Sequence, residues 1–321
     1  MKKRVLSMFM ALALCLTLLS ATALAADITR PSTGETETIR EVTGNGTIQS
    51  SQSVSKLDFR FSDDQPTVET QYTITDGGTA KWEPGNDSTP NKLTLDNVTM
   101  TGDTYVVGVP ANTEIVLTGS NKITATNGTA ICAQNAPLKI TGSGSLNVNV
   151  TAPPPASAFA YALCTNISGA IDVSIGGALT VNGNIRANDG ALSLQSGDDI
   201  FVTGSVYGKK SITAIAGKSL SITNTSGTAV FASSCNEVSL AAQKGNLTVS
   251  GTGTNYAYGI DGDDSKTVLK LHASGNVLVT GTKASVHGET LELSGTIPED
   301  STLTAYWVDS MTIPAGKMLI N

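Results

Sequence analysis

The sequence predicts an all-β protein, a single-chain parallel β-helix solenoid with three strands per coil and about eight coils. Two observations support this fold. Short runs alternate between apolar and polar residues, and the same three runs return every 20–33 residues. Alternation is the period of a β-strand, in which successive side chains point to opposite faces. A fixed period of this length is typical of solenoids, which stack one small unit on the next.

The third strand of each unit shows the period most clearly. Its equivalent residues are Leu146, Leu179, Ile200, Leu220, Leu247 and Val277, with separations of 33, 21, 20, 27 and 30 residues. The second strand repeats in step, in runs such as APLKITG, SITAIAG and NEVSLAA. No amphipathic stretch of helical length interrupts the pattern, which excludes helical solenoids and leucine-rich horseshoes with helices. The usual rule for connections between parallel strands favours a right-handed path.

Each strand is expected to place two apolar side chains inside the solenoid. These inward pairs are Leu138/Ile140, Leu192/Leu194, Leu220/Ile222, Leu247/Val249 and Val277/Val279. The turns between strands are rich in glycine. Gly142, Gly176–Gly177 and Gly217 are expected at positive φ, which glycine adopts without steric cost.

The two ends of the chain differ from the repeats. Residues 1–25 read as a secretory signal peptide, with the basic start MKKR, an apolar run to Leu19 and small residues up to Ala25. A secreted, extracellular or cell-surface protein is therefore expected. The predicted organisation is signal peptide 1–25, linker or N-terminal cap 26–56 and β-helix domain 57–321, the last divided into a capping segment 57–91, regular coils 92–294 and a C-terminal cap or truncated coil 295–321.

Charge and hydropathy limit the partners. The net charge is −7, and it becomes −10 once the three basic residues of 1–25 are removed. Binding to a phosphate backbone needs clustered Lys and Arg, so this balance argues against nucleic acid and anionic lipid surfaces. No second apolar stretch is long enough to span a bilayer, so no membrane insertion of the mature chain is expected.

Three cysteines remain after residue 25: Cys132, Cys164 and Cys235. An odd and widely spaced set does not form a disulfide framework. Cys132 and Cys164 occupy the same position in successive coils, which brings them within disulfide reach. Secretion permits that bond. Two stacked, buried thiols are the alternative, and Cys235 has no predicted partner.

Part of the repeat resembles a known family. The residues that carry the resemblance are Leu93–Val98 (LTLDNV), Gly119–Ile123 (GSNKI) and Leu138–Gly144 (LKITGSG). They are similar to the repeats of secreted β-helix proteins of Gram-positive, gut-type bacteria that are usually described as carbohydrate-binding-domain proteins. The resemblance covers most of residues 57–290. It implies an extracellular protein with a glycan-binding role, but no residue-level site.

The first strand of each coil contains the candidate binding residues. The residues Ile131, Leu163, Ile185, Val206, Val230, Ile260 and Val286 align as an inward column, and the next positions are Cys132, Cys164, Arg186, Tyr207, Phe231, Asp261 and His287. We predict that this second set points outward. Aromatic rings stack on the apolar faces of sugars while Arg, Asp and His bind hydroxyls, so Arg186, Tyr207, Phe231, Asp261 and His287 are the candidate ligand-binding residues.

Alternatives to a glycan-binding column stay open. The column could be an ordinary strand surface, or a loop such as TAPPPASAF could cover it. A register slip of one residue would instead turn the whole column into the core.

One acidic turn offers metal ligands, and the chain lacks common catalytic motifs. In GIDGDDSKT, Asp261, Asp263 and Asp264 bring oxygen ligands together that could hold Ca²⁺, although a solvated acidic turn has the same composition. No G-x-S-x-G, H-E-x-x-H or P-loop motif occurs. The sequence therefore predicts a secreted, non-catalytic protein that binds a polysaccharide or another cell-surface partner. A polysaccharide-degrading lyase or glycosidase and a structural rod or adhesin fragment are the alternatives.

Overall fold

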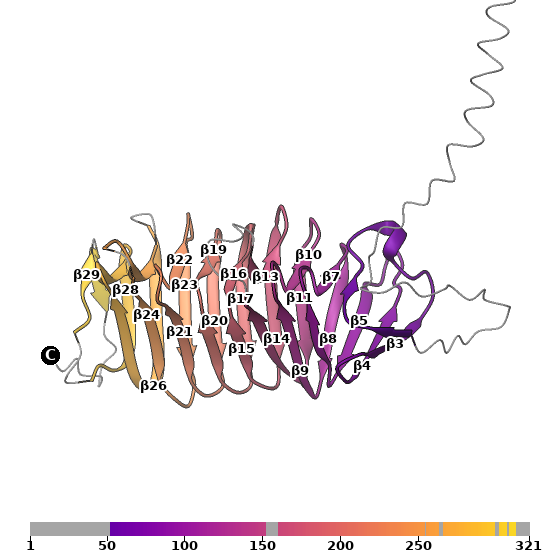
Figure 1. The fold of residues 1–321 in the computed structure, drawn as a ribbon. Helices are drawn as coiled ribbons and strands as arrows, with labels where there is room; N and C mark the ends of the chain where they lie inside the picture. The colour runs from indigo at the N-terminus through magenta and orange to yellow at the C-terminus, as the bar shows by residue number, and fades with distance from the viewer. Residues whose placement is uncertain are drawn as a thin grey trace, which may run out of the picture. The chain divides into compact units, whose positions relative to one another are not determined.

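The structure is a computed structural model, and it describes residues 52–151, 160–253, 255–262, 266–298, 302–306 and 308–312. The predicted signal peptide (1–25) and the predicted linker up to residue 51 lie outside the described residues, as do Asp263 and Asp264. The described strands stack into a parallel β-solenoid with three strands per coil (Figure 1). The predicted fold class is confirmed.

The strands form three sheets, named here by their order within each coil. The first sheet contains β2 (Leu57–Asp58), β7 (Val107–Val109), β10 (Ile131–Ala133), β13 (Tyr161–Thr165), β16 (Asn184–Arg186), β19 (Val206–Gly208), β22 (Val230–Ala232), β25 (Tyr258–Asp261), β27 (Ala284–His287) and β29 (Ala305–Tyr306). The second sheet contains β1 (Gln52–Val54), β3 (Thr70–Ile74), β4 (Thr79–Glu83), β5 (Asn91–Asp96), β8 (Thr113–Thr118), β11 (Leu138–Gly142), β14 (Gly169–Ile175), β17 (Asp189–Ser196), β20 (Ser211–Ala216), β23 (Glu237–Ala242), the start of β26 (Val268–Gly281), β28 (Thr290–Thr296) and β30 (Ser310–Thr312).

The third sheet contains β6 (Thr99–Gly102), β9 (Ser120–Ala125), β12 (Ser145–Val150), β15 (Leu179–Asn182), β18 (Ile200–Thr203), β21 (Leu220–Asn224), β24 (Leu247–Gly251) and the end of β26. Strand β26 pairs with β23 at its start and with β24 at its end, so it joins the second sheet to the third. A short 3-10 helix, η1 (Ser62–Asp64), follows β2.

The register between coils follows the predicted repeat. Leu146 pairs with Leu179, and Leu179 pairs with Ile200 in the next coil. The pairing then continues through Leu220, Leu247 and Val277, as the spacing of the third strand predicts. Among the described residues the first sheet has ten strands, one per coil, where the sequence predicts about eight coils. The two terminal strands of that sheet, β2 and β29, have only two residues each, too few to show an alternating pattern.

The core is a continuous column of Leu, Ile, Val and Ala side chains inside the coils. All five predicted inward pairs are buried there, with at most 2% of any of these side chains exposed. Identical apolar positions stack from coil to coil, so each strand is covered above and below by its own repeat. Burial of this apolar surface is the main stabilising contribution, and it does not require disulfides.

The N-terminal end departs from the parallel pattern. Strands β3, β4 and β5 pair antiparallel, in and next to the segment 57–91 that the sequence predicts as a cap. Trp82 is buried on β4, and its ring lies 4.9 Å from the ring of Phe59. Its indole nitrogen donates to the carbonyl of Pro66 at 2.9 Å, so its polar group is satisfied.

The glycines in the turns have two different roles. Gly142 has a φ of 119°, as predicted. Gly176, Gly177 and Gly217 do not adopt positive φ, so that part of the prediction is wrong. A Cβ added to Gly217 would lie 2.2 Å from the carbonyl oxygen of Gly197 in the neighbouring coil. These turns need glycine because successive coils approach closely.

Within the part of the chain that the structure describes, no helix has the length and apolar character needed to cross a membrane.

Candidate ligand-binding site

The outward positions of the first sheet form a single aligned set, named here the outer column. Its members, in order along the solenoid, are Asp58, Gly108, Cys132, Cys164, Arg186, Tyr207, Phe231, Asp261, His287 and Tyr306. Seven of these ten residues, from Cys132 to His287, are those that the sequence aligns. The neighbouring inward column, Ile131 to Val286, is fully buried, so the predicted register holds.

The side chains of the outer column are only partly exposed to solvent. Cys132 and Cys164 are buried, whereas Arg186, Tyr207 and Phe231 are half-buried. Neighbouring strands lie only about 4.8 Å apart, so large side chains at equivalent positions cover one another. The rings of Tyr207 and Phe231, for example, have centroids 5.6 Å apart.

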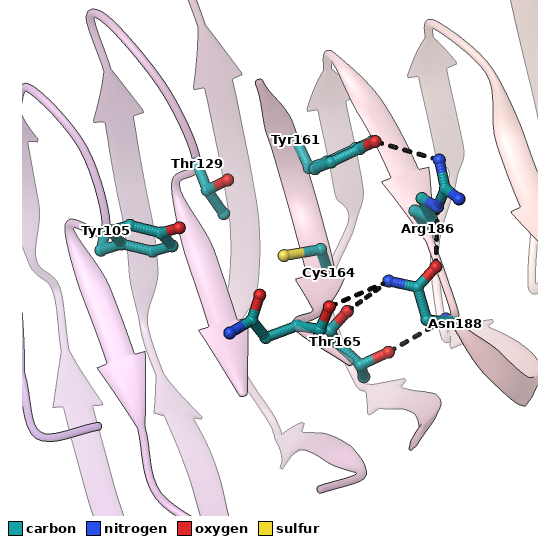
Figure 2. A pocket seen from close by; sticks show the side chains of 8 residues that line it. Tyr105, Thr129, Tyr161, Cys164, Thr165, Arg186 and Asn188 are labelled. Atoms are coloured by element: carbon teal, nitrogen blue, oxygen red, sulfur yellow. Dashed lines mark hydrogen bonds between the residues drawn. The ribbon is translucent and has the colours of Figure 1, made fainter. Parts of the chain in front are cut away.

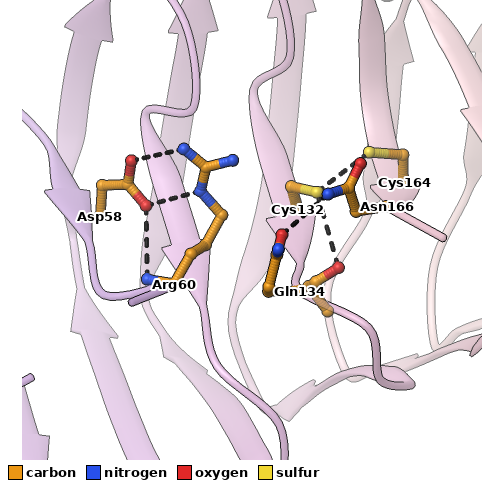
Figure 3. A network of polar contacts seen from close by, with 7 residues as sticks. Asp58, Arg60, Cys132, Gln134, Cys164 and Asn166 are labelled. Carbon is orange, nitrogen blue, oxygen red and sulfur yellow. Dashed lines mark hydrogen bonds and ion pairs between the residues drawn. The ribbon is translucent and has the colours of Figure 1, made fainter. Parts of the chain in front are cut away.

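An ion pair lies at the N-terminal end of the column (Figure 3). The guanidinium of Arg60 donates two hydrogen bonds to Asp58, from Nε at 2.7 Å and from Nη2 at 2.8 Å. The same guanidinium lies 3.4 Å from the ring centroid of Tyr105. The side chains of Arg60 and Asp58 are only 10% and 13% exposed, which makes this pair a structural element of the face.

The next two coils contribute a pair of thiols. The sulfur atoms of Cys132 and Cys164 lie 3.2 Å apart and are hydrogen-bonded (Figure 3). The hydrogen bond with Cys132 lowers the pKa of the Cys164 thiol, and the charges of Arg60 and Arg186 act in the same direction. The hydrogen bond with Cys164, together with burial, raises the pKa of the Cys132 thiol. One sulfur of the pair therefore ionises before the other.

Arg186 occupies the next position and is held by three neighbours. Its Nε donates to Oδ1 of Asn188 at 2.7 Å, and its Nη1 donates to the hydroxyl of Tyr161 at 3.1 Å. Its guanidinium lies 4.8 Å from the ring centroid of Tyr207. Among the described residues no carboxylate forms an ion pair with Arg186, unlike Arg60. Its guanidinium is therefore held by neutral hydrogen-bond acceptors and an aromatic ring.

A pocket of about 320 Å³ opens beside Arg186 (Figure 2). It is lined by Tyr105, Thr129, Tyr161, Cys164, Thr165, Asn166, Arg186 and Asn188. Asn188 is fixed by a bond from its Nδ2 to the carbonyl of Thr165 at 2.8 Å. The pocket thus combines two phenol rings with a cation and fixed amides, which suits a ring-sized polar ligand.

Asp261 and His287 form a separate cluster further along the column. The carboxylate Oδ1 of Asp261 lies 2.7 Å from Nδ1 of His287. The imidazole stacks on Tyr258, with ring centroids 5.3 Å apart, and meets the edge of Tyr306. The ammonium of Lys283 lies 4.3 Å from the ring centroid of Tyr306. These polar groups bind one another, so this cluster is less suited to holding sugar hydroxyls than the pocket is.

The structure describes only one of the three residues of the predicted calcium site, Asp261. Asp263 and Asp264 lie outside the described residues, and Asp261 pairs with His287. Among the residues that are described, no three His, Cys, Asp or Glu side chains converge as metal ligands. The calcium site stays a prediction.

Several residues of this face were not predicted from the sequence. Asp58 follows Leu57 just as Cys132 follows Ile131, so the run LDFRF contains the signal that would have found it. Tyr105 and Tyr161 gave no such signal. Tyr105 lies in a turn with a φ of 49°, and Tyr161 lies where the register between β13 and β16 shifts.

No protein-family model, curated protein or solved structure matches the chain. The resemblance to carbohydrate-binding β-helix proteins therefore stays a prediction.

Proposed function

We propose that this chain is a secreted, non-catalytic protein that binds glycans on the outward face of its first sheet. One observation carries the proposal. Six of the seven tyrosines lie in strands of this sheet or in the turns that enter them, namely Tyr105, Tyr161, Tyr207, Tyr256, Tyr258 and Tyr306. Aromatic rings are only 5% of the residues, so the tyrosines are concentrated in one of the three sheets and the turns that enter it.

The chemistry of the face supports a sugar ligand. A sugar ring offers C–H groups on its face and hydroxyls at its rim, and phenol rings and fixed amides complement these groups. The pocket lies at the lower end of the range of about 300–1,000 Å³ for small-molecule sites. It therefore suits one ring of a polymer, and Tyr207 and Phe231 continue the face along the solenoid.

The proposal is tested by retention of the chain from Ala26 onward on immobilised plant, mucin and bacterial polysaccharides. Released sugar is measured in the same wells. We expect retention without sugar release, and loss of retention in the Tyr207→Ala/Phe231→Ala double variant. Phe201→Ala is the matched control, because Phe201 is 43% exposed on the third sheet and belongs to another face.

Other outcomes would overturn the proposal. Sugar release would make the chain a polysaccharide-degrading enzyme. Retention on none of the polymers would leave the structural rod. Equal loss in the double variant and in Phe201→Ala would remove the first sheet as the binding face.

A further inference from the structure

The geometry of the Cys132–Cys164 pair would allow a disulfide bond between the two residues. The two residues are directly paired on the parallel strands β10 and β13, in register. Their sulfur atoms lie 3.2 Å apart. Paired positions on adjacent strands fall in the range of Cα separations that disulfides bridge, about 4.4–6.8 Å. Formation of a bond would need only a small movement of the two side chains.

The two thiols differ in their access to solvent. Cys164 lines the pocket beside Arg186, and Figure 2 shows its sulfur directed into it. Cys132 is fully buried and does not line the pocket. The thiolate is the reactive form of cysteine, and nearby guanidinium groups stabilise it. Cys164 thus has both features: the pKa of its thiol is lowered, and it lines the pocket.

We propose that Cys132 and Cys164 form a thiol–disulfide exchange site that reacts with low-molecular-weight disulfides entering through the pocket. The Cys164 thiolate attacks one sulfur of the small disulfide, which forms a mixed disulfide and releases one small thiolate. Cys132 then gives up its proton and attacks the sulfur of Cys164, which forms the Cys132–Cys164 disulfide and releases the second small thiol. Two cysteine thiols are oxidised and one small disulfide is reduced to two thiols.

Cys235 provides a control within the same chain. It is also buried, and its Sγ donates to the carbonyl of Gly208 at 3.4 Å. Burial raises the pKa of its thiol to about 11. It does not line the pocket beside Arg186. Because it is buried and lies outside that pocket, Cys235 should stay unreactive in the folded protein.

The test treats the folded protein, reduced beforehand, with hydroxyethyl disulfide, an uncharged probe small enough for the pocket. Peptide mapping by mass spectrometry then locates each bond. We expect a link between the peptides of Cys132 and Cys164, while Cys235 stays a thiol. The same chain unfolded in urea shows that the reagent reaches all three cysteines. A folded wild-type protein that keeps all three thiols under these conditions would overturn the proposal.

Single variants distinguish the attacking thiol, Cys164, from the resolving thiol, Cys132. Cys132→Ser should accumulate the mixed disulfide on Cys164, because no second thiol resolves it. Cys164→Ser should lower the rate of reaction at Cys132 by on the order of tenfold or more. Cys235→Ser should form the disulfide as the wild type does. Circular dichroism melting confirms that each variant is folded, and labelling of Cys132 at the wild-type rate in Cys164→Ser would contradict the assigned order. None of these outcomes depends on whether the protein binds a glycan.

Discussion

The outward faces of the first and second sheets have the same backbone and different chemistry. On the second sheet, ion pairs such as Lys139–Glu114 and Lys270–Glu237 bridge successive coils, at 3.1 Å and 2.6 Å. The lysines of these two pairs are 51% and 41% exposed. On the first sheet, the outer column packs rings, thiols and a guanidinium together, and its Arg60–Asp58 pair is nearly buried.

The difference between the two outward faces shows which side chains the fold requires and which it does not. Both sheets place aliphatic residues inward, and that side alone suffices to stack the coils. Solvated Thr, Ser, Lys and Glu are adequate outward residues, as the second sheet shows. On the first sheet, side chains that could be solvated are packed together instead, which the stacking of the coils does not require.

The largest effects should come from the shared core, where the two sheets are equivalent. Leu194→Ala on the second sheet and Leu163→Ala on the first should each lower the free energy of unfolding by about 2–5 kcal/mol. Both side chains are fully buried, so each substitution leaves a cavity. Urea denaturation of the two variants measures this. A large cost on one sheet and almost none on the other would break the equivalence.

Removal of an ion pair should cost more stability on the outward face of the first sheet than on that of the second. Arg60→Ala leaves the carboxylate of Asp58 nearly buried without its cation, and we expect a loss of about 2–3 kcal/mol, below the cost at a fully buried pair. Lys270→Ala removes an exposed pair and should cost less than about 1 kcal/mol. Thermal melts of both variants test the difference. Equal costs would mean that the Asp58–Arg60 pair is solvated.

Substitutions of aromatic residues on the first and third sheets should differ less in their cost to stability than the ion-pair substitutions do. Phe231→Ala removes a half-buried ring that packs on Tyr207, and should lower the free energy of unfolding by about 1–2 kcal/mol. Phe201→Ala, on the third sheet, should change it by about 0.5 kcal/mol or less. Chemical denaturation measures both. If Phe231→Ala were as mild as Phe201→Ala, the outer column would be an open surface.

The smallest effect should be the acid sensitivity of the second sheet. Burial pushes the pKa of Glu114 up, but hydrogen bonds from Lys139 and Thr141 outweigh it, so the pKa lies below its usual 4.5. A carboxylate with a depressed folded pKa stabilises the fold above its unfolded value and loses that contribution as the pH falls through its folded value. We expect a loss of less than about 1 kcal/mol below pH 4.5.

Glu114→Gln tests this contribution. The variant should remove that part of the pH dependence, measured as the difference between melting temperatures at neutral and acidic pH. An unchanged profile would show that the Glu114–Lys139 pair does not contribute to stability.

The candidate site was only partly predictable. The alignment of Arg186 with Tyr207 follows from the period, because parallel coils place equivalent residues side by side. The pocket did not follow, because Tyr105 and Tyr161 lie in a turn and at a register shift. The pairing of Asp261 with His287 was also unforeseen, since adjacency alone does not show whether two side chains bind each other or face solvent.

By itself, the sequence determined the strands, the register between coils and the residues of the core. A period of two and a repeat of 20–33 residues leave one compact way to bury the alternating Leu, Ile and Val side chains. Only the tertiary structure decided which outward residues are solvated, which are packed together and where the surface is hollowed. Those properties depend on turns and on the lengths of neighbouring side chains, which carry no periodic signal.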